Sequence, residues 1–574
     1  MQHNADIQKI TRHYLPHDFS IVNWESLQSY FEELSQRPLD SLQALEQWMK
    51  DTSELQAVIS EDVCWRQIRM TCDTENKSLE EAFNFFCMEI EPKIKPYADA
   101  LNKKMMACPF VKELDQKLYY TYLRGVEKEI RLFNEKNIEL SAELNVLAQH
   151  YGSITGKMSV TIEDKEYTLQ QAAKFLMLSD RNKRLDVYTK VNERRKQDED
   201  ELNKLFDELL AKRHQVALNA GFQNYRDYKF EELGRFDYSV KDCENFHDSI
   251  KQFITPIVEQ LYEHKRKQLG LDHLKPYDVD AEPEGQKPLE PFQNGEELLE
   301  KSIQAFSNLR PYFGDCLRKM KALNQFDLDS RKGKAPGGYN CPLAETGAPF
   351  IFMNAAGTAD DVVTMMHEGG HALHSFLSHD LSLSAFKEYP MEMAELASMS
   401  MELFSMDQWP VFYTNEAELK RAKAEELERA LSIFPWIATI DKFQHWLYTH
   451  PGHSVAERTS AWLEIHQEFS PKNILWDGLE SYRAILWQKQ LHLFEVPFYY
   501  IEYGIAQLGA LAMWKQYKAD KEKTLDLYML ALSKGNTQTL PELYKTAGIR
   551  FDFSAETVRE LSEFVQVEMK AVFE

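Results

Sequence analysis

Apolar residues recur at three- and four-residue spacing through most of this chain, which is the pattern of amphipathic helices. Residues 198–219, DEDELNKLFDELLAKRHQVALN, show it clearly, with charged residues between the apolar ones. The pattern runs through the first 195 residues and again from Gly357 almost to the C-terminus. Glycine and proline are scarce, with 22 and 21 in 574 residues, which favours long helices over a many-turned sheet. The sequence therefore predicts a mainly helical fold.

Three segments depart from the helical pattern. Residues 157–168 alternate between apolar and polar positions and predict a short hairpin. Residues 269–291 are rich in Pro, Asp, Glu and Gly and predict an irregular excursion. Residues 348–353, APFIFM, are short, apolar and aromatic, and predict a strand. We expect residues 350–353 to form an edge strand that pairs with the backbone of a bound peptide.

The charge balance excludes some classes of partner. With 67 basic against 91 acidic residues, the formal net charge is −24, and no basic stretch is present that would neutralise a nucleic-acid backbone. No apolar run approaches the roughly 18 residues of a membrane span. The first twenty residues lack the pattern of a secretory signal. The seven cysteines are scattered and form no CxxC pair, as in proteins of a reducing compartment. We therefore expect a cytoplasmic protein that binds neither nucleic acid nor membrane.

The candidate chemistry lies in a predicted helix with the sequence DVVTMMHEGGHALHSFLS. Thr358 is expected to cap this helix, with Asp361 completing a capping box. His367 and His371 are four residues apart, so their imidazoles lie one turn apart on the same face and can bind one zinc ion. Glu368 follows the first histidine and can direct its carboxylate at a water molecule on the metal.

Two adjacent glycines, Gly369 and Gly370, interrupt this helix, where each costs about 1 kcal/mol relative to alanine. Such a pair indicates that something approaches the helix closely. A tightly packed neighbouring helix would explain it, and so would a ligand that reaches the backbone.

A catalytic zinc site with two histidines and a water needs one more protein ligand. A second predicted helix after Pro390 carries Glu392, Glu395 and Glu402. From spacing alone, Glu392 and Glu395 are equal candidates for the third ligand. Glu395 and Glu402 share a face with Ser398, an arrangement that offers one ligand and two possible hydrogen-bond partners for the ligand histidines.

HEGGHALH followed by EYPMEMAELASMSMELF resembles the M3 family of metallopeptidases, which includes thimet oligopeptidase. The likeness is to the oligoendopeptidase F and Pz-peptidase branch. It extends over roughly residues 200–570. The resemblance implies one zinc ion per chain, with Glu395 as the third ligand beside His367 and His371. It also implies that Glu368 is the catalytic base.

A third likeness to the family lies in residues 490–504, QLHLFEVPFYYIEYG. The family carries a histidine followed by a tyrosine cluster at this point, and these groups bind the substrate carbonyl and stabilise the oxyanion. His492 and Tyr503 match that pattern. Tyr499 and Tyr500 compete for the remaining position, which we assign to Tyr500. The alternative is that these aromatic residues are part of the core.

The resemblance further implies a two-lobed helical body around a deep channel, with a small sheet beside the zincin-like HExxH helix. We divide the chain into an N-terminal helical region, residues 1–195, and a catalytic region, residues 196–574. The expected function is a zinc metalloendopeptidase that cleaves short unstructured oligopeptides internally. Two alternatives stay open: a zinc carboxypeptidase or dipeptidase on a related scaffold, and a peptide-binding protein without catalysis. The sequence predicts no oligomeric state and no cofactor besides zinc.

Overall fold

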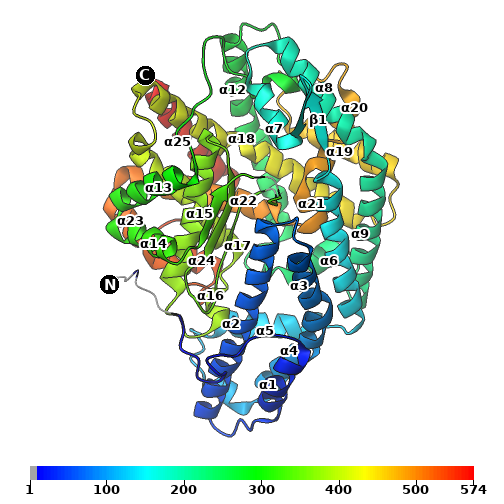
Figure 1. Cartoon of the computed structure of the whole chain (residues 1–574), viewed down its shortest axis with the longest axis vertical. Coiled ribbons are helices and arrows are strands. Elements are labelled where there is room, and N and C mark those ends of the chain that lie inside the picture. The colour runs from blue at the N-terminus through cyan, green and yellow to red at the C-terminus, as the bar shows by residue number, and fades with distance from the viewer. Residues whose placement is uncertain (1–4, 6–8, 332, 336, 574) are drawn as a thin grey trace. The chain divides into compact units, whose positions relative to one another are not determined.

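The computed structural model describes residues 5, 9–331, 333–335 and 337–573, and it is mainly helical, as predicted (Figure 1). The chain forms two compact units. The first unit consists of Met1–Ile138, Glu290–Ala422 and Ala506–Phe551, and the second of Glu139–Leu289, Lys423–Ile505 and Asp552–Glu574. Residues 195 and 196 both lie in the second unit. A boundary between an N-terminal and a catalytic region at that point stays a prediction.

The N-terminal helices of the first unit pack around an apolar cluster that includes Leu27, Phe31, Trp48, Leu101 and Met105. Their apolar residues recur once per turn, so each helix buries one face. The helices of residues 1–138 are α1 (Trp24–Gln36), α2 (Leu42–Cys72), α3 (Lys77–Phe85), α4 (Glu91–Ala107) and α5 (Tyr120–Leu132). Helix α6 (Lys136–Thr155) follows them and continues into the second unit.

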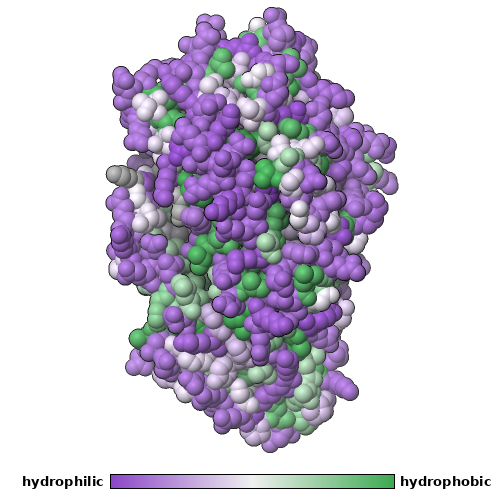
Figure 2. Space-filling view, turned by 90° about the vertical axis from the view of Figure 1, so that its right-hand side faces the viewer, coloured by the Kyte–Doolittle hydropathy of each residue, from purple (hydrophilic) through white to green (hydrophobic). Residues whose placement is uncertain are grey.

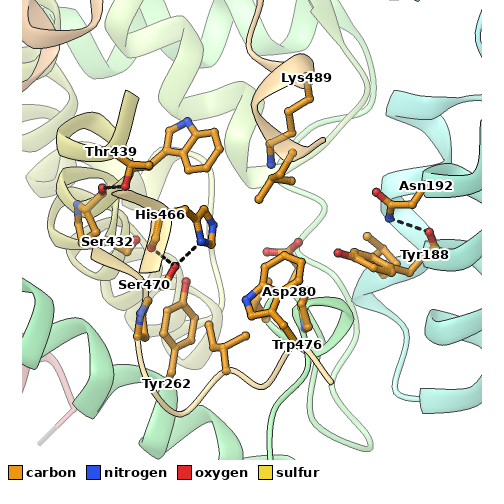
Figure 3. Close-up of a pocket in the computed structure, with 18 of the residues that line it drawn as sticks. Tyr188, Asn192, Tyr262, Asp280, Ser432, Thr439, His466, Ser470, Trp476 and Lys489 are labelled. Atoms are coloured by element: carbon orange, nitrogen blue, oxygen red, sulfur yellow. Dashed lines mark hydrogen bonds between the residues drawn. The ribbon is translucent and has the colours of Figure 1, made fainter. Parts of the chain in front are cut away.

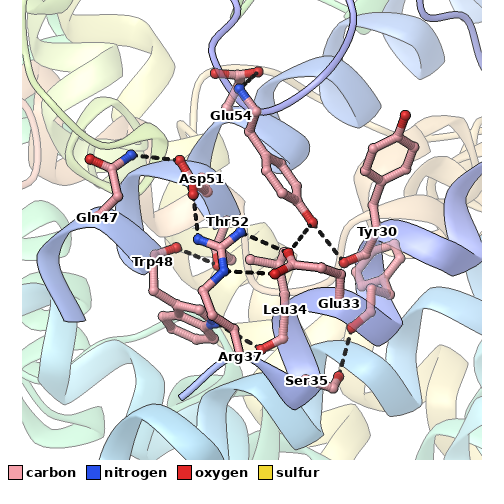
Figure 4. Close-up of polar contacts among 12 residues, drawn as sticks. Tyr30, Glu33, Leu34, Ser35, Arg37, Gln47, Trp48, Asp51, Thr52 and Glu54 are labelled. Carbon is pink, nitrogen blue, oxygen red and sulfur yellow. Dashed lines mark hydrogen bonds and ion pairs between the residues drawn. The ribbon is translucent and has the colours of Figure 1, made fainter. Parts of the chain in front are cut away.

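Arg37, at the C-terminal end of α1, joins that helix to α2 (Figure 4). Its guanidinium donates to the carboxylate of Glu33 at 2.7 and 2.9 Å and also to the carboxylate of Asp51. The indole nitrogen of Trp48 donates to the carbonyl of Leu34 at 2.9 Å. Paired charges and satisfied polar groups at this junction fix the angle at which the long helix α2 leaves it.

The small sheet of the first unit contains β3 (Phe326–Asp329), β4 (Tyr339–Cys341) and β5 (Phe350–Ala355) in the order β3-β5-β4. The predicted strand is present as β5, which is parallel to β3 and antiparallel to β4. The prediction that it is an edge strand is wrong. Both of its edges are paired, because the apolar residues of β5 are buried on both faces in the middle of the sheet. The strand at one edge is β4.

Helix α2 packs against this sheet within the first unit. Ile68 joins a cluster with Cys341, Phe350 and Phe352, and the hydroxyls of Thr71 and Tyr339 lie 2.6 Å apart. Helix α2 therefore takes part in two apolar clusters, one with the other N-terminal helices and one with the sheet.

In the second unit, α6 is followed by the predicted hairpin, formed by the antiparallel strands β1 (Ser159–Ile162) and β2 (Lys165–Thr168). The predicted helix at residues 198–219 is α9. Residues 269–291 are irregular apart from a short turn of 3₁₀-helix at Pro276–Asp278, as the sequence predicts. The helices here are α7 (Leu169–Ala173), α8 (Arg181–Gln197), α9 (Glu199–Asn219), α10 (Tyr225–Glu232), α11 (Val240–Ser249) and α12 (Thr255–Gln268).

The rest of the chain is helical apart from the small sheet. In the first unit, α15 packs against α13, α14, α17, α23 and the strands β4 and β5, so it is central to that unit. The helices are α13 (Gly295–Leu309), α14 (Pro311–Ala322), α15 (Ala359–Ser378), α16 (Ser384–Lys387), α17 (Met391–Ser405), α18 (Glu416–Thr449), α19 (Val455–Phe469), α20 (Glu480–Ala484), α21 (Leu491–Glu495), α22 (Tyr500–Ala519), α23 (Lys521–Leu532), α24 (Leu540–Thr546) and α25 (Ala555–Phe573).

The face of the molecule in Figure 2 is mostly hydrophilic, with hydrophobic residues in smaller groups among the polar ones. Among the described residues, no helix has the length and apolar character that a bilayer crossing requires.

Candidate metal centre

Helix α15 begins where the sequence predicts. The Thr358 hydroxyl accepts from the amide of Asp361 at 3.3 Å, and the Asp361 carboxylate accepts from the amide of Thr358 at 2.8 Å. This reciprocal pair satisfies two of the amides that a helix start leaves without partners. From that start, His367 and His371 lie one turn apart, with ring centroids separated by 4.8 Å.

The two glycines of α15 are explained by close packing. A Cβ atom on Gly370 would lie 2.6 Å from the Cα of Ser398 and 2.7 Å from the carbonyl oxygen of Ala397, both on α17. A Cβ atom on Gly369 would lie 2.3 Å from the ring of Phe306 on α13. Both distances are too short for any side chain, so glycine is what allows α15 and α17 to approach each other here. Of the two explanations open from the sequence, the close-packed helix accounts for both glycines.

That close approach brings a carboxylate to the two histidines. Oε2 of Glu395 lies 3.3 Å from Nε2 of His367 and 3.8 Å from Nε2 of His371. The three possible ligand atoms all lie within 4.8 Å of one another. Zinc bonds to nitrogen and oxygen are about 2.0–2.2 Å long, so neighbouring ligand atoms of a tetrahedral site stand about 3.3–3.6 Å apart. The group therefore fits one zinc ion with small adjustments.

Two further residues of α17 hold these side chains. Nδ1 of His367 lies 2.6 Å from Oε1 of Glu402, on the side of the ring away from Glu395. The hydroxyl of Ser398 donates to Oε2 of Glu395 at 3.1 Å. The Glu402 contact is one that the spacing of α17 predicts, whereas Ser398 was expected to contact a ligand histidine and its hydroxyl instead donates to Glu395. A histidine that donates one ring N–H to a carboxylate keeps its other nitrogen in a fixed direction and makes it a better ligand.

Glu368 is placed beside this group. It is buried, and its Oε2 makes no hydrogen bond to any described residue. Burial raises the pKa of Glu368 to about 7, and the nearby carboxylates of Glu395 and Glu402 add to the rise. A buried acceptor without a protein partner, next to three converging ligand atoms, fits a metal that carries a water molecule there. The side chain of Asn340, on β4, donates to the backbone carbonyl of Glu368 at 3.2 Å, a contact that the sequence gave no reason to expect.

The other predicted residues gather in the second unit. Nε2 of His492 lies 3.4 Å from the hydroxyl of Tyr503, and the ring of His492 lies 4.9 Å from the ring of Tyr500. Tyr499 and Tyr503 have ring centroids 5.1 Å apart. Gln490, which sequence reasoning missed, has its amide nitrogen 2.7 Å from Nδ1 of His492. No pattern marks this glutamine, because its partner is set by the turn of chain before α21.

The structure leaves the choice between Tyr499 and Tyr500 open. Tyr500 is the nearer to His492, but it is buried, and burial raises its pKa to about 12. Tyr499 is half-buried, with its ring 5.9 Å from that of His492. The His367 group belongs to the first unit and the His492 cluster to the second. That the two groups act on one substrate is a hypothesis.

Two models of known protein families match most of this sequence. Residues 175–563 match the model of peptidase family M3, and residues 16–133 match that of the peptidase M3 N-terminal domain. The first match contains every residue discussed above for the site.

Individual proteins give the same result. An oligoendopeptidase F homolog of Borreliella burgdorferi is 21% identical over 505 residues, which are 83% of this chain and 82% of that protein. The oligopeptidase PepF of Bacillus subtilis is 22% identical over 326 residues, 53% of this chain and 46% of the relative.

Solved structures extend the likeness to almost the full length. A crystal structure assigned to oligoendopeptidase F superposes with a TM-score of 0.91 at 28% identity, covering 97% of this chain and 98% of the other. Pz peptidase A with an inhibitor also gives a TM-score of 0.91, at 26% identity, covering 97% and 99%. Since the family model spans well over half of the sequence, this chain belongs to peptidase family M3.

Proposed function

We propose that this protein is a zinc-dependent endopeptidase that cleaves internal bonds of short, unstructured peptides, with one zinc ion per chain. His367, His371 and Glu395 are its metal ligands and Glu368 its catalytic base. The observation that carries the proposal is the convergence of three ligand atoms within 4.8 Å beside a buried, unpaired oxygen of Glu368. The names of the relatives, oligoendopeptidase F and oligopeptidase PepF, support the choice of substrate class.

Zinc, when bound, supplies a Lewis acid that polarises the scissile carbonyl and lowers the pKa of water toward neutrality. Glu368 takes the proton of the attacking water and passes it to the departing amine. Its raised pKa suits a group that must both accept and release a proton near neutral pH, and the positive charge of a metal would draw that pKa down again. Glu402 and Ser398 keep His367 and Glu395 directed at the metal.

His492, Tyr503 and Tyr500 complete the proposal as donors to the substrate carbonyl. Hydrogen bonds that strengthen as negative charge develops on that oxygen lower the barrier to its attack. The 3.4 Å contact between Nε2 of His492 and the Tyr503 hydroxyl supports their action on one substrate oxygen. Tyr499 remains the alternative to Tyr500 for the second tyrosine.

The sheet beside α15 supports an extended substrate. Strand β4 has β5 on one side, and no other described strand pairs with it. It also contacts α15 through Asn340. We propose that a peptide adds to the outer edge of β4, in place of the edge first expected at β5. Pairing through the backbone recognises many sequences, but only where the substrate backbone is not already paired.

The test is a library of short peptides blocked at both ends, incubated with and without a chelator and read by mass spectrometry. We expect internal cleavage at several sequences, abolished by the chelator and restored by zinc. A carboxypeptidase or dipeptidase would leave blocked peptides intact and cut unblocked ones near an end. A protein that only binds peptides would cut neither.

Substrate size gives an independent test. We expect folded proteins to be left intact, because the N-terminal helices build one unit with the sheet and are proposed to wall off the site. Denatured casein has an unpaired backbone, as a short peptide does, but it is a much longer chain. If casein were degraded as readily per bond as a decapeptide, the walled site would be wrong while the zinc chemistry stood.

The proposal includes a cytoplasmic location and no nucleic-acid partner. All seven cysteines are free thiols, as expected in a reducing compartment, and the net charge of −24 disfavours binding to phosphate backbones.

A further inference from the structure

The second unit contains a cavity that the proposed chemistry does not use (Figure 3). Its volume is about 360 Å³, within the range of small-molecule sites. Its lining includes residues of α7, α8, α12, α18 and α19, of the 3₁₀ turn Leu486–Lys489, and of the segments around residues 276–280 and 470–476, all within one unit. None of the described lining residues belongs to the unit that contains the His367 group.

Two cations line this cavity without a carboxylate partner. Among the described residues, neither the Arg195 guanidinium nor the Lys489 ammonium has a hydrogen bond or an ion pair, and the Asp280 carboxylate acts on Lys489 only through its charge. The Lys489 ammonium lies 4.9 Å from the ring centroid of Trp436 and is directed into the cavity. Burial among neighbouring groups lowers the pKa of Lys489 to about 8, and the positive charge of Arg195 adds to the effect. Two positive charges that line the same cavity favour an anion that lies between them.

The cavity also offers one negative charge. Among the described lining residues Asp280 is the acidic one, and its carboxylate faces the same central space as Lys489. His466 adds no charge, because burial together with Arg483 and Lys489 lowers its pKa to about 3. The lining therefore has two positive groups and one negative group around a single space.

The remaining walls are aromatic and apolar. Tyr188, Tyr262, Trp436 and Trp476 contribute large flat surfaces, and Figure 3 shows the ring of Tyr188 directed inward from α8. Aromatic walls of this kind favour a ligand with a sizeable apolar or aromatic side chain.

We propose that this cavity binds a small zwitterionic peptide, of dipeptide size, with a large apolar side chain. Its carboxylate lies between Arg195 and Lys489, its ammonium group faces Asp280, and its side chain packs on the tryptophan and tyrosine rings. Molecules of this class are what a peptidase releases, so a role in product binding rests on the proposed function. The binding itself requires no catalysis.

A hydrogen-bonded path joins this cavity to the tyrosine cluster. The indole nitrogen of Trp436, in the cavity wall, donates to Oε1 of Gln490 at 2.9 Å, and the amide nitrogen of Gln490 contacts His492. Lys489 precedes Gln490 directly in the chain. Two residues, Trp436 and Gln490, therefore connect an occupant of the cavity to His492, a residue of the proposed catalytic site.

The experiment is calorimetric titration of the zinc-loaded Glu368→Gln protein, which is expected to hydrolyse peptides far more slowly than the wild type, with glycylphenylalanine and its two blocked forms. We expect the free dipeptide to bind about tenfold or more tightly than either the N-acetyl or the C-terminal amide form, because each block removes one charge-assisted contact. Lys489→Met should weaken the free dipeptide by a similar factor and leave the amide unchanged. Asp280→Asn should weaken the free dipeptide and leave the N-acetyl form unchanged.

Controls separate this cavity from the metal centre. Lys472→Met removes an exposed lysine outside the lining and should change nothing. Lys489→Arg keeps the charge and should retain binding, which excludes a folding defect as the cause of a loss. Equal affinity for all three ligands, or dipeptide affinity unchanged by Lys489→Met, would overturn the inference. Hydrolysis by the wild-type protein, measured separately, would still stand in that case.

Discussion

Nδ1 of His367 lies 2.6 Å from Oε1 of Glu402, seven residues beyond Glu395 on the same helix. One helix, α17, therefore supplies both the proposed third ligand and the group that orients the first. The close approach of the two helices depends on Gly370 of α15, and we expect zinc affinity to be sensitive to positions that do not touch the metal.

Glu402→Gln tests that orienting contact. The amide is a weaker acceptor than the carboxylate, so His367 would be held less firmly and would be a poorer ligand. We expect zinc affinity to fall by about 10–100-fold while the fold is kept. Competition with a chelator of known affinity measures it, with circular dichroism as the check on folding. Unchanged affinity would show that Glu402 is a structural carboxylate only.

Glu395→Ala and Glu392→Ala separate the two candidates for third ligand. Both side chains are buried on α17, and Glu395 is the one that forms a possible ligand group with the two histidines. We expect Glu395→Ala to lower zinc affinity by more than roughly 100-fold, the upper end of the loss seen when a residue that hydrogen-bonds to a ligand is removed. We expect Glu392→Ala to keep its zinc affinity. Metal content of the two purified variants decides the matter, and the reverse order would place the ligand one turn away.

Gly370→Ala tests the packing of α15 on α17. Its Cβ would lie 2.6 Å from the Cα of Ser398, so the helices would separate and carry Glu395 away from the histidines. We expect a loss of about 1–3 kcal/mol in the free energy of unfolding together with weaker zinc binding. The matched control is Gly125→Ala in α5, where a Cβ meets nothing within 4 Å. That change should stabilise the protein by up to about 1 kcal/mol. If both variants behaved alike, close packing would not explain Gly370.

Single Tyr→Phe substitutions at positions 499, 500 and 503 test the proposed oxyanion donors. Loss of a hydroxyl that binds the developing charge should lower kcat by about 10²–10³-fold with little change in KM. We expect this for Tyr503→Phe and for Tyr500→Phe, and a nearly normal rate for Tyr499→Phe. The opposite order at 499 and 500 would assign the role to Tyr499. Normal rates in all three variants would mean that the cluster is only core.

The elements of the site that depend on short stretches of sequence were predictable. The capping box at Thr358 and the single-turn spacing of His367 and His371 follow from helix geometry alone. Spacing could not choose between Glu392 and Glu395. Both lie on α17, and the sequence does not say which face of α17 is turned toward the histidines. The family resemblance selected Glu395, and the structure places its carboxylate beside the histidines.

What sequence could not supply is set by contacts between distant segments. The apolar stretch at β5 indicated a strand, but whether it is central or at an edge depends on β3 and β4, which pair with it from both sides. The pair Gly369 and Gly370 indicated a close approach without naming Phe306 and α17 as its cause. The cavity of the second unit is lined from segments spread over more than 300 residues, from Leu169 to Lys489, and no local pattern marks it.

The central claim is that Glu368 carries the proton in zinc-dependent peptide hydrolysis, and turnover by zinc-loaded Glu368→Gln tests it most directly. The amide keeps the size of the side chain but cannot accept the proton of water. With zinc content equal to that of the wild type, kcat on a peptide blocked at both ends should fall by about 10²–10⁴-fold, the usual contribution of a general base. A zinc-loaded variant that hydrolyses the same peptide at the wild-type rate would contradict the mechanism.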